Sequence, residues 1–241
     1  MKETILTQEI FKTLDYARAR SACVLIQGKT GRGKTEAVKA WTKRKKDSLY
    51  IDCPAEGGRP AIAQALMDAT GASSATALEK FFAARKATVV LDECARLIPD
   101  RNRGGKATAL EYLRRLHDEA GVALCFIATD FFIKSCTAGS VGEYLEQFIG
   151  RFRDKLIIPD YVSLAESKDI LESIINDPAE DAIRWASYIA NERGKGGARR
   201  LWWLLEDAAD IAKQTKHEIT VDFLRAVLKD YEGRQRLPDK E

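Results

Sequence analysis

The order of apolar and polar stretches along the chain predicts two regions of different architecture. Short apolar runs occur at 23–26, 49–51, 88–91, 122–128 and 154–159, and each is bounded by polar or turn-forming residues. Apolar runs of about 4–8 residues between such boundaries are typical of buried strands. Because helical patterns separate the runs, we expect a parallel sheet that is covered by helices on both faces.

Helical periodicity describes the rest of the chain. Residues 5–20 place Leu6, Ile10 and Leu14 on one face of an amphipathic helix that leads into the first apolar run. From residue 163 onward the pattern is helical throughout. We therefore expect an α/β nucleotide-binding domain over 1–160, a helical domain over 161–232 and a flexible tail over 233–241. The individual helices are expected near 61–69, 77–84, 107–119, 163–175, 178–192, 198–215 and 219–230.

Composition narrows the class of protein without defining it. The chain has 241 residues, a formal net charge of +3 and five cysteines, which form no C-x-x-C pair. From this cysteine pattern we expect reduced thiols and no zinc site. We also expect a soluble cytoplasmic protein, because no apolar run approaches the length of a membrane span. Residues 1–50 carry an excess of Lys and Arg over Asp and Glu, which can contact phosphate or can form a solvated face.

A phosphate-binding pattern follows the first apolar run. Residues 28–35 read G-x-x-x-x-G-K-T between a predicted strand and a predicted helix, which is the context that a P-loop requires. The glycines let backbone N–H groups converge on phosphate oxygens, and the helix dipole adds to the attraction. Lys34 is expected to reach the β- and γ-phosphates, and the Thr35 hydroxyl to ligate Mg²⁺. The predicted ATP-binding residues are Gly28, Lys29, Thr30, Gly31, Arg32, Gly33, Lys34 and Thr35.

Two acidic residues end the third apolar run. Residues 88–91 are followed by Asp92 and Glu93, the pattern of a Walker B motif. In that pattern Asp92 holds the hydration shell of Mg²⁺, and Glu93 polarises the attacking water. The two motifs together predict hydrolysis of ATP with Mg²⁺ as cofactor.

These motifs and their order resemble the AAA+ ATPases over about residues 5–230. The resemblance implies a P-loop AAA+ core, with a parallel five-stranded sheet flanked by helices, and a C-terminal all-helical lid. It makes Thr129 the sensor-one residue, with Asp130 as a poorer alternative because a carboxylate repels phosphate. Arg151, or alternatively Arg153, occupies the position of the arginine finger that acts on a neighbouring subunit's nucleotide. Gly196-Gly197-Ala198-Arg199 resembles the sensor-two signature and assigns Arg199 to ATP binding, with Arg200 as the alternative.

Within that class the chain resembles the compact group that includes the phage Mu B transposition protein and related transposon ATPase regulators. The resemblance implies self-assembly into a helical filament or ring on duplex DNA without sequence preference, and a transposase as partner. The basic residues expected to contact DNA lie in two polar loops: Arg59, Arg101, Arg103 and Lys106. The alternatives are a helicase loader or initiator-like remodeller, and a nucleotide-gated signalling scaffold that does not bind DNA.

Overall fold

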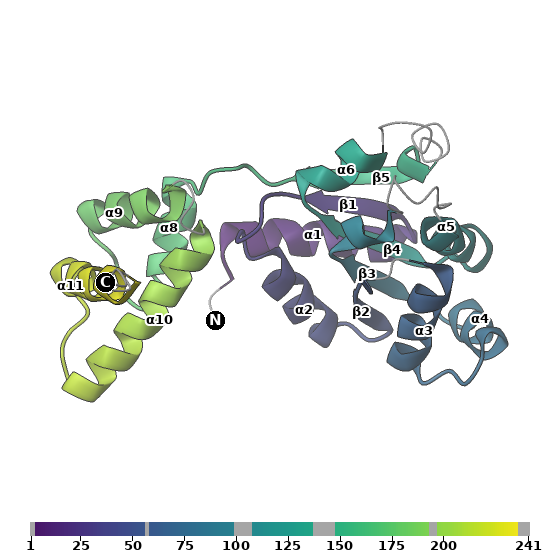
Figure 1. The fold of residues 1–241 in the computed structure, drawn as a ribbon, viewed down its shortest axis with the longest axis horizontal. Coiled ribbons are helices and arrows are strands. Elements are labelled where there is room, and N and C mark those ends of the chain that lie inside the picture. Colours follow the sequence, from purple (N-terminus) through teal and green to yellow (C-terminus); the bar gives the residue numbers. More distant parts are fainter. Residues whose placement is uncertain (1–2, 56–57, 99–107, 137–147, 193–196, 236–241) are drawn as a thin grey trace, which may run out of the picture. The chain divides into compact units, whose positions relative to one another are not determined.

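The computed structural model describes residues 3–55, 58–98, 108–136, 148–192 and 197–235, and the structural statements below concern these residues. They form two compact units (Figure 1). One unit contains the sheet and comprises Thr7–Lys29 and Lys34–Ile158. The other, which is helical, comprises Met1–Leu6, Thr30–Gly33 and Pro159–Glu241, so the tip of the P-loop groups with the helices and not with the sheet.

The sheet unit contains five parallel strands in the order β2-β3-β4-β1-β5. The predicted five-stranded parallel sheet is therefore confirmed. Its strands are β1 (Cys23–Gln27), β2 (Ser48–Asp52), β3 (Thr88–Asp92), β4 (Ala123–Ala128) and β5 (Phe152–Ile157). Since β4 and β5 flank β1, the strand order changes direction beside β1. Because all strands are parallel, the carboxyl ends of β1, β3 and β4 meet at one edge. Ligands of open α/β sheets bind at such an edge.

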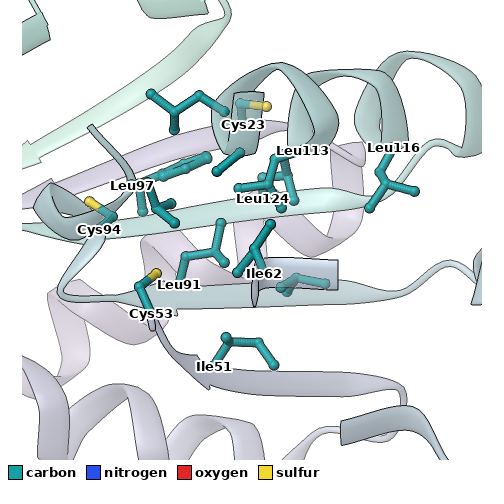
Figure 2. Close-up of a cluster of buried hydrophobic side chains, with 14 of the residues drawn as sticks. Cys23, Ile51, Cys53, Ile62, Leu91, Cys94, Leu97, Leu113, Leu116 and Leu124 are labelled. Atoms are coloured by element: carbon teal, nitrogen blue, oxygen red, sulfur yellow. The ribbon is translucent and has the colours of Figure 1, made fainter. Parts of the chain in front are cut away.

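One face of the sheet is buried under three helices. These are α3 (Arg59–Thr70), α4 (Ala75–Ala83) and α5 (Thr108–Ala120), and they contact one another. Alternate strand residues such as Cys23, Leu25 and Leu91 join them in a single buried cluster, part of which Figure 2 shows. The period-two alternation follows from strand geometry, which sends successive side chains to opposite faces.

The opposite face is covered by different elements. The intervening residues Val24 and Ile26 are also fully buried but lie outside that cluster. The helix α2 (Lys34–Arg44) contacts β2 and β3, and it packs beside α1 (Ile5–Arg20), where the buried Trp41 indole donates to Asp15 at 3.0 Å. Burial on both faces explains why the central strands read as continuous apolar runs.

The helical unit has its own apolar core. It contains α8 (Leu164–Leu171), α9 (Glu180–Asn191), α10 (Ala198–Thr215) and α11 (Val221–Gln235), which contact one another in sequence order. Leu171, Ala186, Leu201 and Leu224 lie in its buried centre. Searching the described residues reveals no helix with the length and hydropathy needed to span a bilayer.

Candidate nucleotide site

Residues 28–35 connect β1 to α2 at the carboxyl edge of the sheet. The Gly28 N–H donates to the Ala128 carbonyl at 3.1 Å, which continues the β1–β4 pairing into the loop. A Cβ on Gly28 would lie 2.8 Å from the Cβ of Ile158, so a side chain there would displace the residue that follows β5. Gly31 and Gly33 have φ values of +84° and +79°, a region that favours glycine. The strand-loop-helix context that the motif requires is therefore present.

The side chain of Lys34 lies over this loop. Its Nζ donates to the carbonyl oxygens of Gly28 at 2.6 Å and Lys29 at 2.8 Å, and the residue is buried. Lys34 also begins α2, where backbone N–H groups lack partners within the helix. The ammonium group and the helix start together concentrate positive charge where phosphate oxygens are expected.

Thr35 and Asp92 meet across the edge of the sheet. The Thr35 hydroxyl donates to Asp92 Oδ2 at 2.7 Å, and Asp92 is 4% exposed at the end of β3. Hydroxyl and carboxylate oxygens are the ligand types that Mg²⁺ prefers, directly or through its water shell. The predicted metal ligands are thus brought together with the right chemistry, and they would hold the ion beside the phosphates.

Tyr50 joins this pair and was not identified from the sequence. Its hydroxyl donates to the same oxygen, Asp92 Oδ2, at 3.0 Å, while the N–H of Glu93 donates to Oδ1 at 2.9 Å. Burial and the Asp92 carboxylate raise the pKa of Tyr50 far above its usual value, so the phenol remains a proton donor. Tyr50 lies next to Asp92 because β2 pairs with β3 in the sheet. Sequence periodicity does not show which strands pair, so this contact could not be predicted.

Glu93 follows Asp92 and is exposed. Its backbone has φ 51° and ψ 38°, the left-handed conformation that non-glycine residues seldom adopt. It precedes the short 3₁₀ helix η1 (Cys94–Leu97). An exposed carboxylate next to the metal-binding position fits the predicted role of orienting a water molecule.

The residues after β4 separate the two sensor-one candidates. The Oδ1 atom of Asp130 accepts a hydrogen bond from the Gln27 side chain at 2.9 Å. Asp130 is also the first residue of α6 (Asp130–Cys136), a helix that was not predicted from the sequence. Thr129 is half-buried, and its carbonyl accepts from Phe132 N at 3.1 Å. Asp130 is therefore engaged with Gln27, which leaves Thr129 as the better candidate.

The two finger candidates differ in their surroundings. Arg151 lies before β5 and forms a two-pronged ion pair with Asp118 of α5, with Nε–Oδ1 at 3.2 Å and Nη2–Oδ2 at 3.0 Å. These hydrogen bonds lower the pKa of the Asp118 carboxyl. Arg153 is exposed within β5, at a bulge where Cys23 pairs with Phe152 and Val24 with Asp154. β5 thus begins before the predicted residue 154 and includes Arg153.

The sensor-two candidates also differ. Arg200 is buried and forms ion pairs with Glu192 and Glu232 inside the helical unit. Arg199 is exposed, its guanidinium carbon lies 6.0 Å from the centre of the Trp203 ring, and its backbone N–H donates to the Gly31 carbonyl at 3.1 Å. The guanidinium of Arg200 is therefore engaged in buried ion pairs within the helical unit, and Arg199 is the candidate whose side chain is accessible to a ligand.

One P-loop side chain has an unexpected partner. The guanidinium of Arg32 is buried and forms a 2.8 Å ion pair with Glu166 of α8. Its Nε and Nη1 have no hydrogen-bond partner among the described residues. Sequence reasoning named Arg32 only as a position of the loop, and it did not identify Glu166.

The predicted DNA contacts are largely outside the described residues. Arg101, Arg103 and Lys106 lie in the undescribed range 99–107. Arg59, predicted in a loop, is instead the first residue of α3; it is exposed and its guanidinium lies 5.3 Å from the centre of the Tyr112 ring.

Comparison with known proteins agrees with this geometry. Residues 17–134 match the family model described as an AAA domain. A search of curated proteins gave no match. The matched residues include both the P-loop and the acidic end of β3.

Solved structures share the fold over nearly all of the chain. Domain III of the Thermotoga maritima replication initiation protein DnaA has a TM-score of 0.57 at 16% identity, with 92% of this chain and 90% of that chain covered. Cdc6p from Pyrobaculum aerophilum has a TM-score of 0.63 at 17% identity, covering 90% of this chain and 64% of that one. A replication initiator DnaA bound to AMPPCP and single-stranded DNA has a TM-score of 0.56 at 13% identity, covering 90% and 66%. The family model thus covers residues 17–134, and these structures share the fold of the chain.

Proposed function

We propose that this protein binds and hydrolyses ATP with Mg²⁺ and assembles on DNA when ATP is bound. The observation that carries the proposal is the convergence of Lys34, Thr35 and Asp92 at one edge of the sheet, with the Thr35 hydroxyl 2.7 Å from Asp92 Oδ2. Glu93 follows with an exposed carboxylate. This is the set of groups that phosphoryl transfer to water requires: phosphate cation, metal ligands and water activator.

Each residue has a distinct task in the proposed reaction. Bound Mg²⁺ would neutralise charge on the phosphates and orient them. Lys34 would exchange its carbonyl contacts for the β- and γ-phosphates, and Glu93 would orient the attacking water. Thr129 would hydrogen-bond that water or the γ-phosphate, and Arg199 would contact the nucleotide as a second cation. No step requires a covalent intermediate, because positioning and charge stabilisation supply most of the catalysis.

We further propose that hydrolysis depends on assembly. A guanidinium from a neighbouring copy, either Arg151 or Arg153, would complete the charge stabilisation, so that an isolated subunit binds ATP but turns it over slowly. The assembly would be a filament or a ring, and the protein would act in the cytoplasm.

The biological task has two candidates. The first is target capture and transposase activation in DNA transposition, which rests on the sequence likeness to the Mu B group. The second is an initiator-like or helicase-loading remodeller, which is supported by the fold shared with DnaA and Cdc6p; one of those structures is described as bound to single-stranded DNA. The two differ in the form of DNA that the assembly should prefer.

Electron microscopy of the full chain with ATP or ADP, and with duplex or single-stranded DNA, tests the proposal. ATP-dependent filaments on duplexes of unrelated sequence support the transposition role, whereas assembly confined to single strands supports the initiator-like role. Lys34→Ala should remove ATP binding and assembly together, while Lys43→Ala, an exposed cation at the end of the same helix, should remove neither. Equal assembly with ATP, with ADP and without nucleotide would contradict the proposal.

A further inference from the structure

The hydroxyl of Tyr50 contacts the candidate metal site without being a candidate ligand. Tyr50 lies in β2, which pairs with β3 so that Asp52 aligns with Asp92. Its hydroxyl lies 3.0 Å from Asp92 Oδ2, the oxygen that also accepts from Thr35. Three donors therefore fix this carboxylate: two hydroxyls on Oδ2 and the Glu93 N–H on Oδ1.

The Tyr50 ring is itself held in place. The Nζ of Lys39 on α2 lies 5.2 Å from the centre of the ring, on its face, as in a cation–π contact. The ring is half-buried between this lysine and the Asp92 carboxylate. A rigid phenol contributes more to the orientation of a carboxylate than a flexible side chain does, because little conformational freedom is lost when the hydrogen bond forms.

Of the two hydroxyls that donate to Asp92 Oδ2, only that of Thr35 is also a candidate metal ligand. A hydroxyl oxygen ligates a cation through a lone pair and can still donate its proton, so Thr35 could bind Mg²⁺ and keep its hydrogen bond to Asp92, with an orientation that the ion would then partly set. Tyr50 ligates nothing in that arrangement and can keep its bond to Oδ2. The phenol would then be a side-chain donor whose geometry does not depend on the ion, and it would help to keep the Asp92 carboxylate oriented toward the water shell of the ion.

We propose that Tyr50 is a positioning residue for the Mg²⁺ site, and that it acts by holding the Asp92 carboxylate through Oδ2. The inference rests on the proposed ATP and Mg²⁺ binding at the P-loop. Partners that orient metal-binding groups commonly change metal affinity about 10–100-fold when they are removed. Tyr50→Phe removes only the hydroxyl and keeps the ring and its contact with Lys39, so the variant should fold.

The test measures metal binding without hydrolysis. A fluorescent, non-hydrolysable ATP analogue is bound to the full chain, and its affinity is followed as Mg²⁺ is titrated at constant ionic strength. Tyr50→Phe should raise the half-saturating Mg²⁺ concentration about 10-fold and leave the metal-free nucleotide affinity unchanged. A purely structural role would lower both affinities together.

A matched control removes a hydroxyl of the same kind elsewhere. Tyr112 also has a buried hydroxyl in the sheet unit, but that oxygen has no hydrogen-bond partner among the described residues. Tyr112→Phe should leave the Mg²⁺ midpoint unchanged. An unchanged midpoint in Tyr50→Phe, or an equal rise in both variants, would overturn the proposal for Tyr50.

Asp92→Asn separates this inference from the function on which it rests. That variant should lose most of the Mg²⁺ response, since it removes the carboxylate charge. If wild type and Asp92→Asn respond to Mg²⁺ alike, the assignment of Asp92 to the metal site fails. If Asp92→Asn loses the response and Tyr50→Phe keeps it, only the role of Tyr50 fails.

Discussion

Glu93 combines an unusual backbone conformation with an exposed carboxylate. Left-handed backbone at a non-glycine residue costs on the order of 1–3 kcal/mol and persists only where the surroundings enforce it. Here the Asp92 carboxylate accepts from the Glu93 N–H, and Cys94 on the other side is fully buried. The buried neighbours hold the turn in place, so the backbone of Glu93, the proposed water-activating residue, is fixed relative to Asp92 by the fold.

Replacing this carboxylate by an amide tests its role at the residue scale. Glu93→Gln should bind Mg²⁺-ATP as wild type does and hydrolyse it about 10²–10⁴-fold more slowly, because an amide cannot accept the proton of the attacking water. Nucleotide affinity and single-turnover phosphate release measure the two effects. Glu36→Gln, an exposed acid in the first turn of α2, is the control. Hydrolysis by Glu93→Gln at the wild-type rate would exclude the proposed role.

Single residues also show where sequence reasoning ends. The pattern around residues 196–200 allowed either arginine as the sensor, since adjacent residues satisfy the same motif almost equally. Only packing distinguishes them: Arg200 is 5% exposed between Glu192 and Glu232, and Arg199 is exposed. Likewise, the motif required a glycine at residue 28, but its contact with Ile158, 130 positions away in sequence, becomes visible only in the fold.

At the scale of elements, β5 and the segment before it carry the assembly hypothesis. Arg151 is paired with Asp118, whose pKa is lowered by that contact. Both groups are partly exposed, so solvent screens the pair and its contribution to stability is about 0–1 kcal/mol. Arg151 can therefore exchange this partner for a phosphate on a neighbouring copy at little energetic cost.

Mixing two inactive variants tests whether the finger acts between subunits. Arg151→Ala should keep the ATP affinity of the isolated subunit but lose assembly-stimulated turnover by about 10³-fold or more. Glu93→Gln subunits bind ATP without hydrolysing it and still carry Arg151, so mixing the two proteins should restore turnover. Steady-state ATPase rates of the mixtures measure this.

Arg153→Ala is the comparison for the alternative finger. If Arg153→Ala loses stimulated turnover and Arg151→Ala does not, the finger is Arg153. Absence of recovery in mixtures of Glu93→Gln with either variant would show that the arginine acts within its own subunit or has no catalytic role.

The elements differ in how well their sequences define them. The apolar runs predicted all five strands, most clearly β1, β3 and β4, whose burial on both faces leaves little room for polar residues. The short helix α6 was missed: its seven residues give too few turns for a helical period to appear, and Phe131 and Phe132 also suit a strand. The start of β5 was placed too late because the charged Arg153 lies at a bulge, where side-chain alternation is interrupted.

At the scale of the whole molecule, the proposed DNA binding would depend on how charge is distributed and not on the modest net charge of +3. The predicted loop cations Arg101, Arg103 and Lys106 should contribute contacts to phosphates without reading sequence. Replacing all three by Ala should weaken duplex binding and reduce the slope of log affinity against log salt by up to about three.

Fluorescence anisotropy over a salt series measures both quantities for the triple variant. ATP affinity should remain that of wild type, because none of the three residues belongs to the P-loop. A control that replaces Lys213, Lys216 and Lys229, cations of the helical unit, should leave the slope unchanged. An unchanged slope in the loop variant would remove these residues from the DNA contacts.

The arrangement of the whole sheet was beyond the reach of sequence reasoning. Periodicity identified strands and their order along the chain but contained no information on which strands become neighbours. The order β2-β3-β4-β1-β5 places Tyr50 beside Asp92 and Gln27 beside Asp130, and neither contact follows from a motif. The P-loop and the acidic strand end could be identified from the sequence because each motif consists of residues that are adjacent in the chain.

The bulged outer strand also bears on solubility. The free side of a terminal strand offers unpaired backbone groups to any extended peptide, and natural sheets protect such sides with charge and with bulges. β5 has both devices, since Arg153, Asp154 and Lys155 are exposed in succession and the bulge lies at their start. Replacing these three charged residues by apolar residues should therefore promote fibrillar aggregation through this side of β5.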